Sequence, residues 1–172
     1  KRRSFIKTGV AGGLAAGFGG IGLSGCTGAS DQVLTVLHTN DVHSHIDPFP
    51  QSHAAYPGMG GAARRASLIR SVREANPNTL LLDAGDIFQG TPYFNFYGGE
   101  LEFRLMSRMG YDAATLGNHD FDNGLEGLLA QLPYADFPFL SANYDFTNTI
   151  MDGQVGPYRM FKRGGLRIGV FG

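Results

Sequence analysis

Three short clusters of the sequence hold side chains that can bind a metal ion or exchange a proton. The clusters comprise Asp41 and His43, then Asp86, then Asn118, His119 and Asp122. Carboxylate oxygens, imidazole nitrogens and amide carbonyl oxygens together suit divalent ions such as Zn, Mn, Fe or Co. Each cluster alone is equally compatible with an ordinary polar loop or turn, but the three together predict metal-assisted chemistry.

The first two clusters have the spacing that convergence on an ion requires. In extended backbone residues i and i+2 point the same way, so the side chains of Asp41 and His43 are expected to meet. Asp86 follows Gly85, which permits a tight turn and a close approach of the backbone. A carboxylate held there can offer each oxygen to a different cation, although an Asx-turn or a helix cap uses the same residue.

The third cluster is the most specific. The carbonyl oxygen of Asn118 can serve as a neutral metal ligand, while the adjacent His119 turns to another side. Asp122, three residues after His119, is expected to accept a hydrogen bond from the imidazole and so fix its tautomer and charge. The alternative is a turn rich in Asn, Asp and Gly, which the following Asn123 and Gly124 favour.

The elements around these clusters must bring them to one place. Apolar and β-branched runs predict buried strands, the first of them buried on both faces, with segments of helical periodicity between them. Strands that alternate with helices predict a layered α/β sheet, in which polar side chains gather beyond the carboxyl ends of the strands. Strands are expected at 33–39, 79–83, 113–116 and 139–142, helices at 62–74, 99–109 and 125–132, and a hairpin at 158–162 and 166–170.

Asp-x-His, Gly-Asp and Gly-Asn-His-Asp, in this order and each after a strand, resemble the motifs of the calcineurin-like metallophosphoesterases. Among these, the bacterial 5′-nucleotidase and UDP-sugar hydrolase subfamily is similar to the segments LHTNDVHSHI, DAGDIFQGTPYF, LGNHDFDNG and SANY. The likeness runs from about Val33 to Gly172. It implies a layered α/β sandwich of the metallophosphoesterase type that hydrolyses phosphate monoesters, above all nucleotides.

The same resemblance implies roles for the matching positions. It assigns Asp41 and His43 to a first divalent metal ion, Asp86 to a position between two ions, and Asn118 to the second ion. The implied mechanism is in-line attack on phosphorus by a hydroxide held between two ions about 3.5–4 Å apart. The metals would neutralise the phosphate and supply the positive charge that an acidic protein lacks.

The resemblance also implies that His119 and Asp122 form a catalytic pair, with His119 stabilising the leaving oxygen or the phosphoryl group. His45 is expected to be a loop or substrate-facing residue, and Asn143 is a candidate for supporting a ligand from behind. Three phenylalanines are expected to pack in the core or the loops rather than to stack on a base. These are Phe88, Phe94 and Phe96.

The first twenty-five residues have the pattern of an export signal. Arg2 and Arg3 precede an uncharged, glycine-rich stretch and resemble a twin-arginine signal read by the export machinery. The segment that ends at Cys26 looks like a bacterial lipobox, which predicts acylation of Cys26, a membrane anchor and a short linker at 26–31. A spanning helix needs ~20 strongly apolar residues, and the eight glycines between Gly9 and Gly25 disfavour any helix. The mature protein is therefore expected in the periplasm or on the cell surface.

The charge of the remaining chain is acidic. From Cys26 onward, ten positively charged side chains stand against fifteen acidic ones. An acidic body argues against nucleic acid or anionic lipid as the main partner and is compatible with a small phosphate ester bound through cations.

Members of the family have further ligands downstream, first a histidine and then a Gly-His-x-His or Gly-His-x-Gln element. No histidine follows His119, and the chain ends at Gly172 in an apolar, strand-like run. We therefore expect 32–172 to be the N-terminal part of a truncated metallophosphoesterase domain, with little or no phosphatase activity alone. Two alternatives are a thiosulfate-ester hydrolase of the same superfamily and a non-catalytic, lipid-anchored metal-binding protein.

Overall fold

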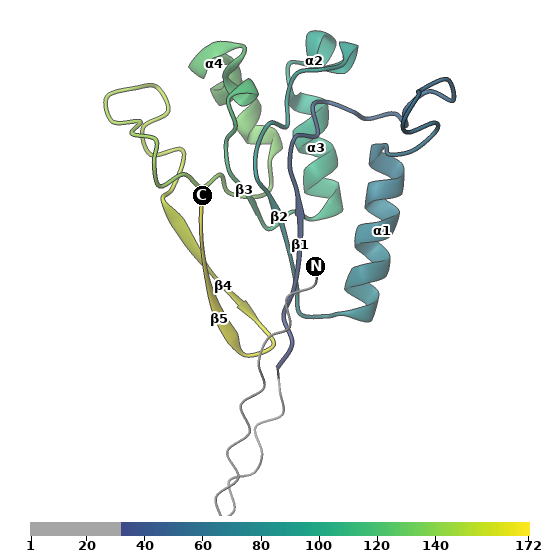
Figure 1. Cartoon of the computed structure of the whole chain (residues 1–172). Coiled ribbons are helices and arrows are strands. Elements are labelled where there is room, and N and C mark those ends of the chain that lie inside the picture. Colours follow the sequence, from purple (N-terminus) through teal and green to yellow (C-terminus); the bar gives the residue numbers. More distant parts are fainter. Residues whose placement is uncertain (1–31) are drawn as a thin grey trace, which may run out of the picture. The chain divides into compact units, whose positions relative to one another are not determined.

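The computed structural model describes residues 32–172, so the predicted signal and Cys26 lie outside the described residues. A three-stranded parallel sheet in the order β1-β2-β3 forms its centre (Figure 1). The strands are β1 (Thr35–Thr39), β2 (Thr79–Asp83) and β3 (Ala113–Ala114). β1 pairs with β2 from Thr35 opposite Thr79 to Thr39 opposite Asp83. Because the strands are parallel and in register, the segments that follow them meet at one edge of the sheet.

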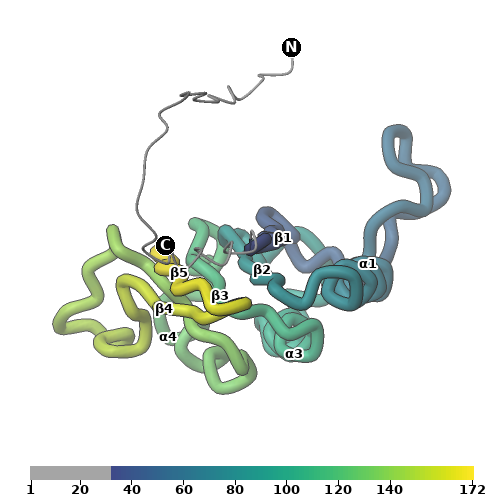
Figure 2. Tube along the Cα trace, turned by 90° about the horizontal axis from the view of Figure 1, so that it is seen from below, coloured from purple at the N-terminus to yellow at the C-terminus, as the bar shows by residue number. Residues whose placement is uncertain are grey.

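Helices connect the strands and cover one face of the sheet. Figure 2 shows α1, α3 and α4 on the same side of β1, β2 and β3. None of the helices in residues 32–172 has the length and hydropathy needed to cross a bilayer. The helices are α1 (Ala62–Ala75), α2 (Pro92–Tyr97), α3 (Glu100–Met109) and α4 (Gly124–Gln131), with 3-10 turns η1 (His119–Phe121) and η2 (Leu132–Tyr134).

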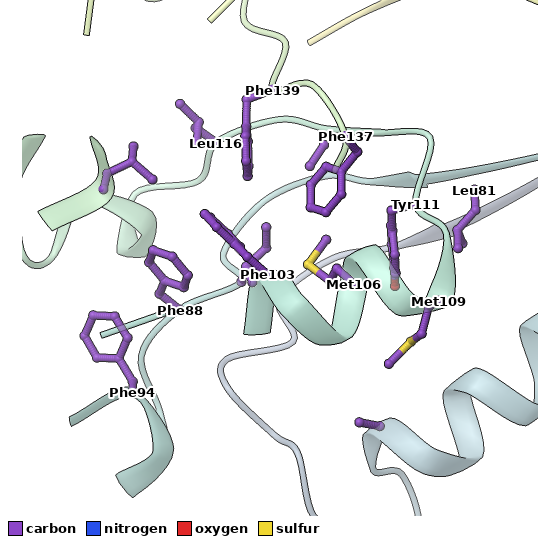
Figure 3. Packing of buried hydrophobic residues seen from close by; sticks show 14 of the residues in the cluster. Leu81, Phe88, Phe94, Phe103, Met106, Met109, Tyr111, Leu116, Phe137 and Phe139 are labelled. Carbon is purple, nitrogen blue, oxygen red and sulfur yellow. The ribbon is translucent and has the colours of Figure 1, made fainter. Parts of the chain in front are cut away.

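The core between the sheet and the helices is rich in aromatic rings (Figure 3). Phe103 of α3 lies at its centre, with ring centroids 4.8 Å from Phe88 and 5.0 Å from Phe139. Burial of one such side chain stabilises the fold by roughly 1.5–3 kcal/mol. Phe88 and Phe94 are buried as expected, whereas the prediction that Phe96 packs is wrong, because its side chain is 81% exposed.

Two other expectations about strands are wrong. β1 is not buried on both faces, since Val36 is 51% exposed and the helices cover only the opposite face. The expected strand at 139–142 is reduced to two isolated bridges, from Phe139 to Ala114 and from Leu140 to Gly156. β3 is only two residues long, so a neighbouring fourth strand can pair with it over a very short stretch only.

The predicted hairpin is confirmed, with β4 (Tyr158–Arg163) antiparallel to β5 (Leu166–Phe171). Its two-residue turn consists of Gly164 at φ 54° and Gly165 at φ 83°. Positive φ at both central positions is the requirement of the type I′ turn, which glycine meets without strain.

Candidate metal centre

The loops after β1 and β2 leave the extended conformation at once. Asp41, His43 and Asp86 have φ values of 51°, 48° and 54°, all in the left-handed region. The expectation that Asp41 and His43 converge through an extended backbone is therefore wrong, although the two side chains do meet. Non-glycine residues held in this region cost of order 1–3 kcal/mol each, and they cluster at functional sites.

Backbone hydrogen bonds between the two loops hold this conformation. The amide of Asp41 donates to the carbonyl oxygen of Gly85 at 2.9 Å, and the amide of His43 donates to that of Asp86 at 3.1 Å. The next amide, of Ser44, donates to Ile87 at 2.9 Å. The strand pairing of β1 with β2 thus continues into the loops, and this continuation brings the first two clusters together.

Asp41, His43 and Asp86 place their ligand atoms within 4.8 Å of one another. Nε2 of His43 lies 3.7 Å from Oδ1 of Asp41, while Nδ1 lies 3.2 Å from the carbonyl oxygen of Phe88. A carbonyl oxygen only accepts, so Nδ1 carries the hydrogen and Nε2 presents its lone pair to the site. An imidazole nitrogen in this tautomer, beside two carboxylates, is a donor set that fits a divalent ion.

Two glycines let the loops after β2 and β3 touch. A Cβ added to Gly117 would lie 2.2 Å from Oδ1 of Asp86, and one added to Gly85 would lie 2.4 Å from the amide nitrogen of Gly117. The amide of His119 donates to the same Oδ1 of Asp86 at 2.9 Å. Asn118, the expected ligand of a second ion, is exposed between these two contacts.

His119 and Asp122 form the pair that their spacing predicts. Nδ1 of His119 lies 2.9 Å from Oδ2 of Asp122, and the rings of His119 and His43 are 5.2 Å apart, edge to face. The hydrogen bond to Asp122 raises the pKa of His119; partial burial lowers it, and the charges of Asp122, Asp86 and Asp120 raise it further. The pair therefore adjoins the candidate ligands and favours the protonated imidazole.

Asp120 organises the centre, a role that the sequence analysis missed. Its side chain is buried and accepts four backbone hydrogen bonds. Oδ2 accepts from Gly117 at 2.8 Å and from Asp86 at 3.0 Å. Oδ1 accepts from Ile87 at 2.9 Å and from Phe88 at 3.1 Å. Asp120 thus joins the second and third clusters. Its position as the last residue of the Gly-Asn-His-Asp motif is the feature of the sequence that could have indicated this role.

A second buried carboxylate, Asp83, ends β2 beneath the centre. It accepts hydrogen bonds from Thr39 and from the amide of Gly85, and the Thr39 hydroxyl lies 2.8 Å from that of Tyr111. Burial raises the pKa of Asp83 to about 6, against the hydrogen bonds from Thr39 and Gly85, which lower it. Asp83 faces the helices rather than the ligand cluster, so it supports β1 and β2 and is not one of the converging groups.

A cavity of about 420 Å³ opens beside Asp41. His45, Arg64 and Arg65 line it, and the ring of His45 lies 4.7 Å from that of Phe49. His45 therefore faces this cavity and does not join the converging group, as expected of a loop or substrate-facing residue.

Asn143 accepts a hydrogen bond from the Ser141 hydroxyl at 3.1 Å. Within residues 32–172, no lysine or arginine pairs with Asp41 or Asp86.

Known proteins are similar to this chain in sequence and fold. Snake venom 5′-nucleotidase from Gloydius brevicauda is 44% identical over 146 residues, which cover 81% of this chain and 25% of the relative. The structure of a 5′-nucleotidase precursor from Thermus thermophilus has a TM-score of 0.74 at 41% identity, over 81% of this chain and 28% of that one. A sulfate thiohydrolase from Thermus thermophilus, with a TM-score of 0.66 over 80% of this chain and 34% of that one, is 19% identical and shares the fold alone.

The parallel sheet and the converging Asp, His and Asp side chains at its carboxyl edge define an α/β domain built around a candidate metal centre. Calcineurin-like phosphoesterases match residues 34–167, and the chain belongs to this family. It spans about a quarter of the length of the curated relatives that it matches.

Proposed function

We propose that this chain is the metal-binding N-terminal part of an exported hydrolase of phosphate monoesters, with nucleotides as substrates. The observation that carries the proposal is the convergence of Asp41, His43 and Asp86 beside the His119–Asp122 pair. Similarity to 5′-nucleotidases at 41–44% identity supports nucleotides over a thiosulfate ester, for which the likeness is limited to the fold.

Each residue has a role that its geometry supports. Asp41, His43 and Asp86 would hold a first divalent ion, and Asp86 with Asn118 would begin the site of a second. When bound, such ions supply Lewis acidity and a nucleophile that works at neutral pH. The tautomer of His43, set by the Phe88 carbonyl oxygen, keeps its Nε2 lone pair available without any proton transfer.

His119 acts on the leaving group. Asp122 holds the Nδ1 hydrogen, so the imidazolium can offer its Nε2 hydrogen to the ester oxygen as negative charge develops there. The raised pKa of His119 favours this charged form. Loss of Asp122 would lower that pKa and reduce the rate of the step while leaving the metal ligands in place.

We propose that the protein is exported through its twin-arginine signal at 1–25 and anchored through acylated Cys26. The basic residues before the glycine-rich stretch, and the lipobox pattern that ends at Cys26, support this assignment. Replacement of Arg2 and Arg3 by lysine should keep the protein in the cytoplasm, and Cys26→Ser should release it from membranes. Unchanged export and membrane fractionation of these variants would contradict the assignment.

The activity test uses the whole protein to which this chain belongs. AMP, UDP-glucose, 2′,3′-cyclic AMP and a thiosulfate ester are compared with and without a chelator, followed by return of Zn, Mn, Fe or Co. We expect chelator-sensitive release of phosphate from AMP, abolished by Asp86→Asn and kept by the control Arg104→Ala, at an exposed position of α3. Hydrolysis of the thiosulfate ester alone, or none of the four, would overturn the proposal.

The chain alone should bind a divalent ion with little or no turnover, because Asp86 and Asn118 supply only part of a second site. Titration calorimetry on the chain and on His43→Ala measures the first ion directly. Rapid metal-dependent turnover by the chain alone would contradict the proposal that its second metal site is incomplete.

A further inference from the structure

The charged side chains of this acidic chain are sorted between the two edges of the sheet. The carboxyl edge carries the metal centre and most of the carboxylates. The amino edge, where β1 and β2 begin, lies beside the hairpin turn, since Gly164 is next to Asn78 and Gly165 is next to Gln32. The last turns of α1 and α3 contribute basic residues. We define the basic face as the basic residues at this edge, with Lys162 and Arg167 on the side of the hairpin opposite to Arg163: Arg70, Arg73, Arg108, Lys162, Arg163 and Arg167.

A half-buried carboxylate, Asp112, joins two parts of this face. Asp112 lies 3.5 Å from Nη2 of Arg73 and also accepts a hydrogen bond from Arg163, so it connects the end of α1 with the end of β4. Arg70, Arg73 and Arg108 border the same hollow between α1 and α3. Six basic residues against three neighbouring carboxylates, Asp112, Glu74 and Asp136, leave a net charge of +3. The face is therefore cationic on a chain whose total charge is negative.

The helix dipole explains part of this charge. Basic side chains in the last turn of a helix interact favourably with its carboxyl end, so Arg73 and Arg108 need no external partner. Lys162 and Arg167 differ, because they lie on strands, directly opposite each other in the β4–β5 pair, and both are exposed. Like charges in opposite positions destabilise an antiparallel pair. In the part of the chain that the structure describes, neither forms an ion pair.

We propose that the basic face docks on an anionic lipid surface and so turns the metal centre away from that surface. Charge complementarity supplies the attraction, and a nearby layer of anionic headgroups would remove the repulsion between Lys162 and Arg167. The chain also enters the domain at this edge, since the side chain of Gln32 lies beside Gly165. The net negative charge of the chain does not oppose this contact, because dissolved salt screens each charge–charge interaction beyond about 8 Å at physiological ionic strength.

The proposed acyl anchor favours lipid over other polyanions. Cys26 precedes Gln32 by six residues, which span at most about 20 Å when fully extended. An acyl group at Cys26 would thus hold the basic face close to the headgroups, where a weak electrostatic contact becomes effective. An acyl anchor at Cys26 and a basic patch would act on the same surface, so the patch adds its attraction to that of the anchor. Docking of the face itself is independent of the proposed enzymatic activity.

The test measures the charge contact without the acyl group or the leader. Every protein is the full chain with Cys26→Ser and with Lys1, Arg2, Arg3 and Lys7 replaced by glutamine. Sedimentation with vesicles compares phosphatidylcholine alone with a mixture containing about one-third phosphatidylglycerol, at about 0.05 M and about 0.3 M salt. The charge-reversal variant is Lys162→Glu/Arg167→Glu. Its control, Arg64→Glu/Arg104→Glu, makes the same change of charge away from the basic face.

We expect binding to the anionic vesicles only, weakened at high salt, and reduced at least tenfold by reversal on the hairpin but less than twofold in the control. A milder pair, Lys162→Gln/Arg167→Gln, should show an intermediate loss and the melting temperature of the parent, which separates charge from misfolding. Equal binding by both reversed variants would overturn the proposal. Binding to soluble heparin with none to vesicles would also overturn it, in favour of a non-lipid polyanion.

Discussion

The carboxyl and amino edges of the β1–β2–β3 sheet share the same strands but differ in how their side chains are held. At the carboxyl edge, Asp41, His43 and Asp86 have left-handed backbones, and their carboxylates have no basic partner within residues 32–172. At the amino edge, Asp112 is matched by Arg73 and Arg163 in regular elements. The amino edge is thus stabilised by its own contacts, whereas the carboxyl edge holds unneutralised charge in a strained loop, ready for a cation.

Close packing at the carboxyl edge should give the largest effect. Gly117→Ala would place a methyl group 2.2 Å from Oδ1 of Asp86, so the two loops must separate. We expect a loss of about 3 kcal/mol or more in the free energy of unfolding. Metal affinity should also fall by at least about tenfold, because Asp86 is displaced. Thermal melting and titration calorimetry with a divalent ion measure the two quantities.

Gly156→Ala is the matched control, since its added Cβ would approach only the carbonyl oxygen of Tyr158, at 3.9 Å. Its stability should change by less than about 1 kcal/mol. If both variants melt together and bind metal equally, the contact between the loops does not position Asp86.

Asp120→Asn tests whether one buried carboxylate assembles the centre. The amide keeps the size of the side chain but turns an NH₂ group toward backbone amides that now donate to Asp120. Unsatisfied buried donors should cost about 2–3 kcal/mol of stability, and metal affinity should fall about 10–100-fold. Asp136→Asn, on an exposed loop, is the control for the lost charge. Unaltered metal affinity in Asp120→Asn would show that the loops hold their shape without it.

Asp112→Asn makes the same chemical change at the amino edge. Asp112 receives hydrogen bonds from the amide of Leu81 at 2.9 Å and from Arg163, and its side chain is 13% exposed. We expect a loss of about 1–2 kcal/mol of stability with no change in metal affinity, because no candidate ligand touches this cluster. Arg104→Ala, which removes the exposed pair with Glu100 and the contact of Arg104 with the Tyr134 ring, should cost no more than about 1 kcal/mol. A drop in metal affinity on Asp112→Asn would remove the distinction between the edges.

The two edges also differ in how far the sequence predicts them. The bounds of β2, the α1 helix and the β4–β5 hairpin follow from periodicity and from Gly164 and Gly165, which are local signals. The approach of Asp86 to Asp41 and His43 followed from the order of strands, because parallel strands deliver their ends to one edge. The contact between His119 and Asp122 followed from their spacing.

What the sequence did not reveal depends on tertiary contacts. The left-handed backbone at Asp41 is held by the hydrogen bond from its amide to Gly85, in the loop after β2. The role of Asp120 depends on four amides from two loops, and no periodicity marks such a residue. The exposure of Val36 depends on which layer covers each face of β1. These features arise between segments that are distant in sequence, and side-chain patterns within one segment do not encode them.

The pH dependence of stability should depend on Asp83, the carboxylate beneath the centre. Burial raises the pKa of Asp83 from 3.8 to about 6, so between these values the folded chain keeps a proton that the unfolded chain releases. The contribution of Asp83 to stability is therefore greatest below this window, falls as the pH rises through it, and is constant above it. A rise of about two pKa units corresponds to a fall on the order of 3 kcal/mol.

Asp83→Asn removes the titrating group and keeps the geometry, because the amide oxygen can accept from Gly85 and the amide NH₂ can donate to the Thr39 hydroxyl. Melting temperatures from about pH 4 to about pH 7 should fall less in this variant than in the parent chain and in Asp136→Asn. An equal fall in all three proteins would assign the pH dependence to other groups and leave Asp83 ionised in its buried site. In that event the hydrogen bonds from Thr39 and Gly85, with a smaller contribution from the charge of Arg65, would hold the carboxylate form of Asp83 in the fold.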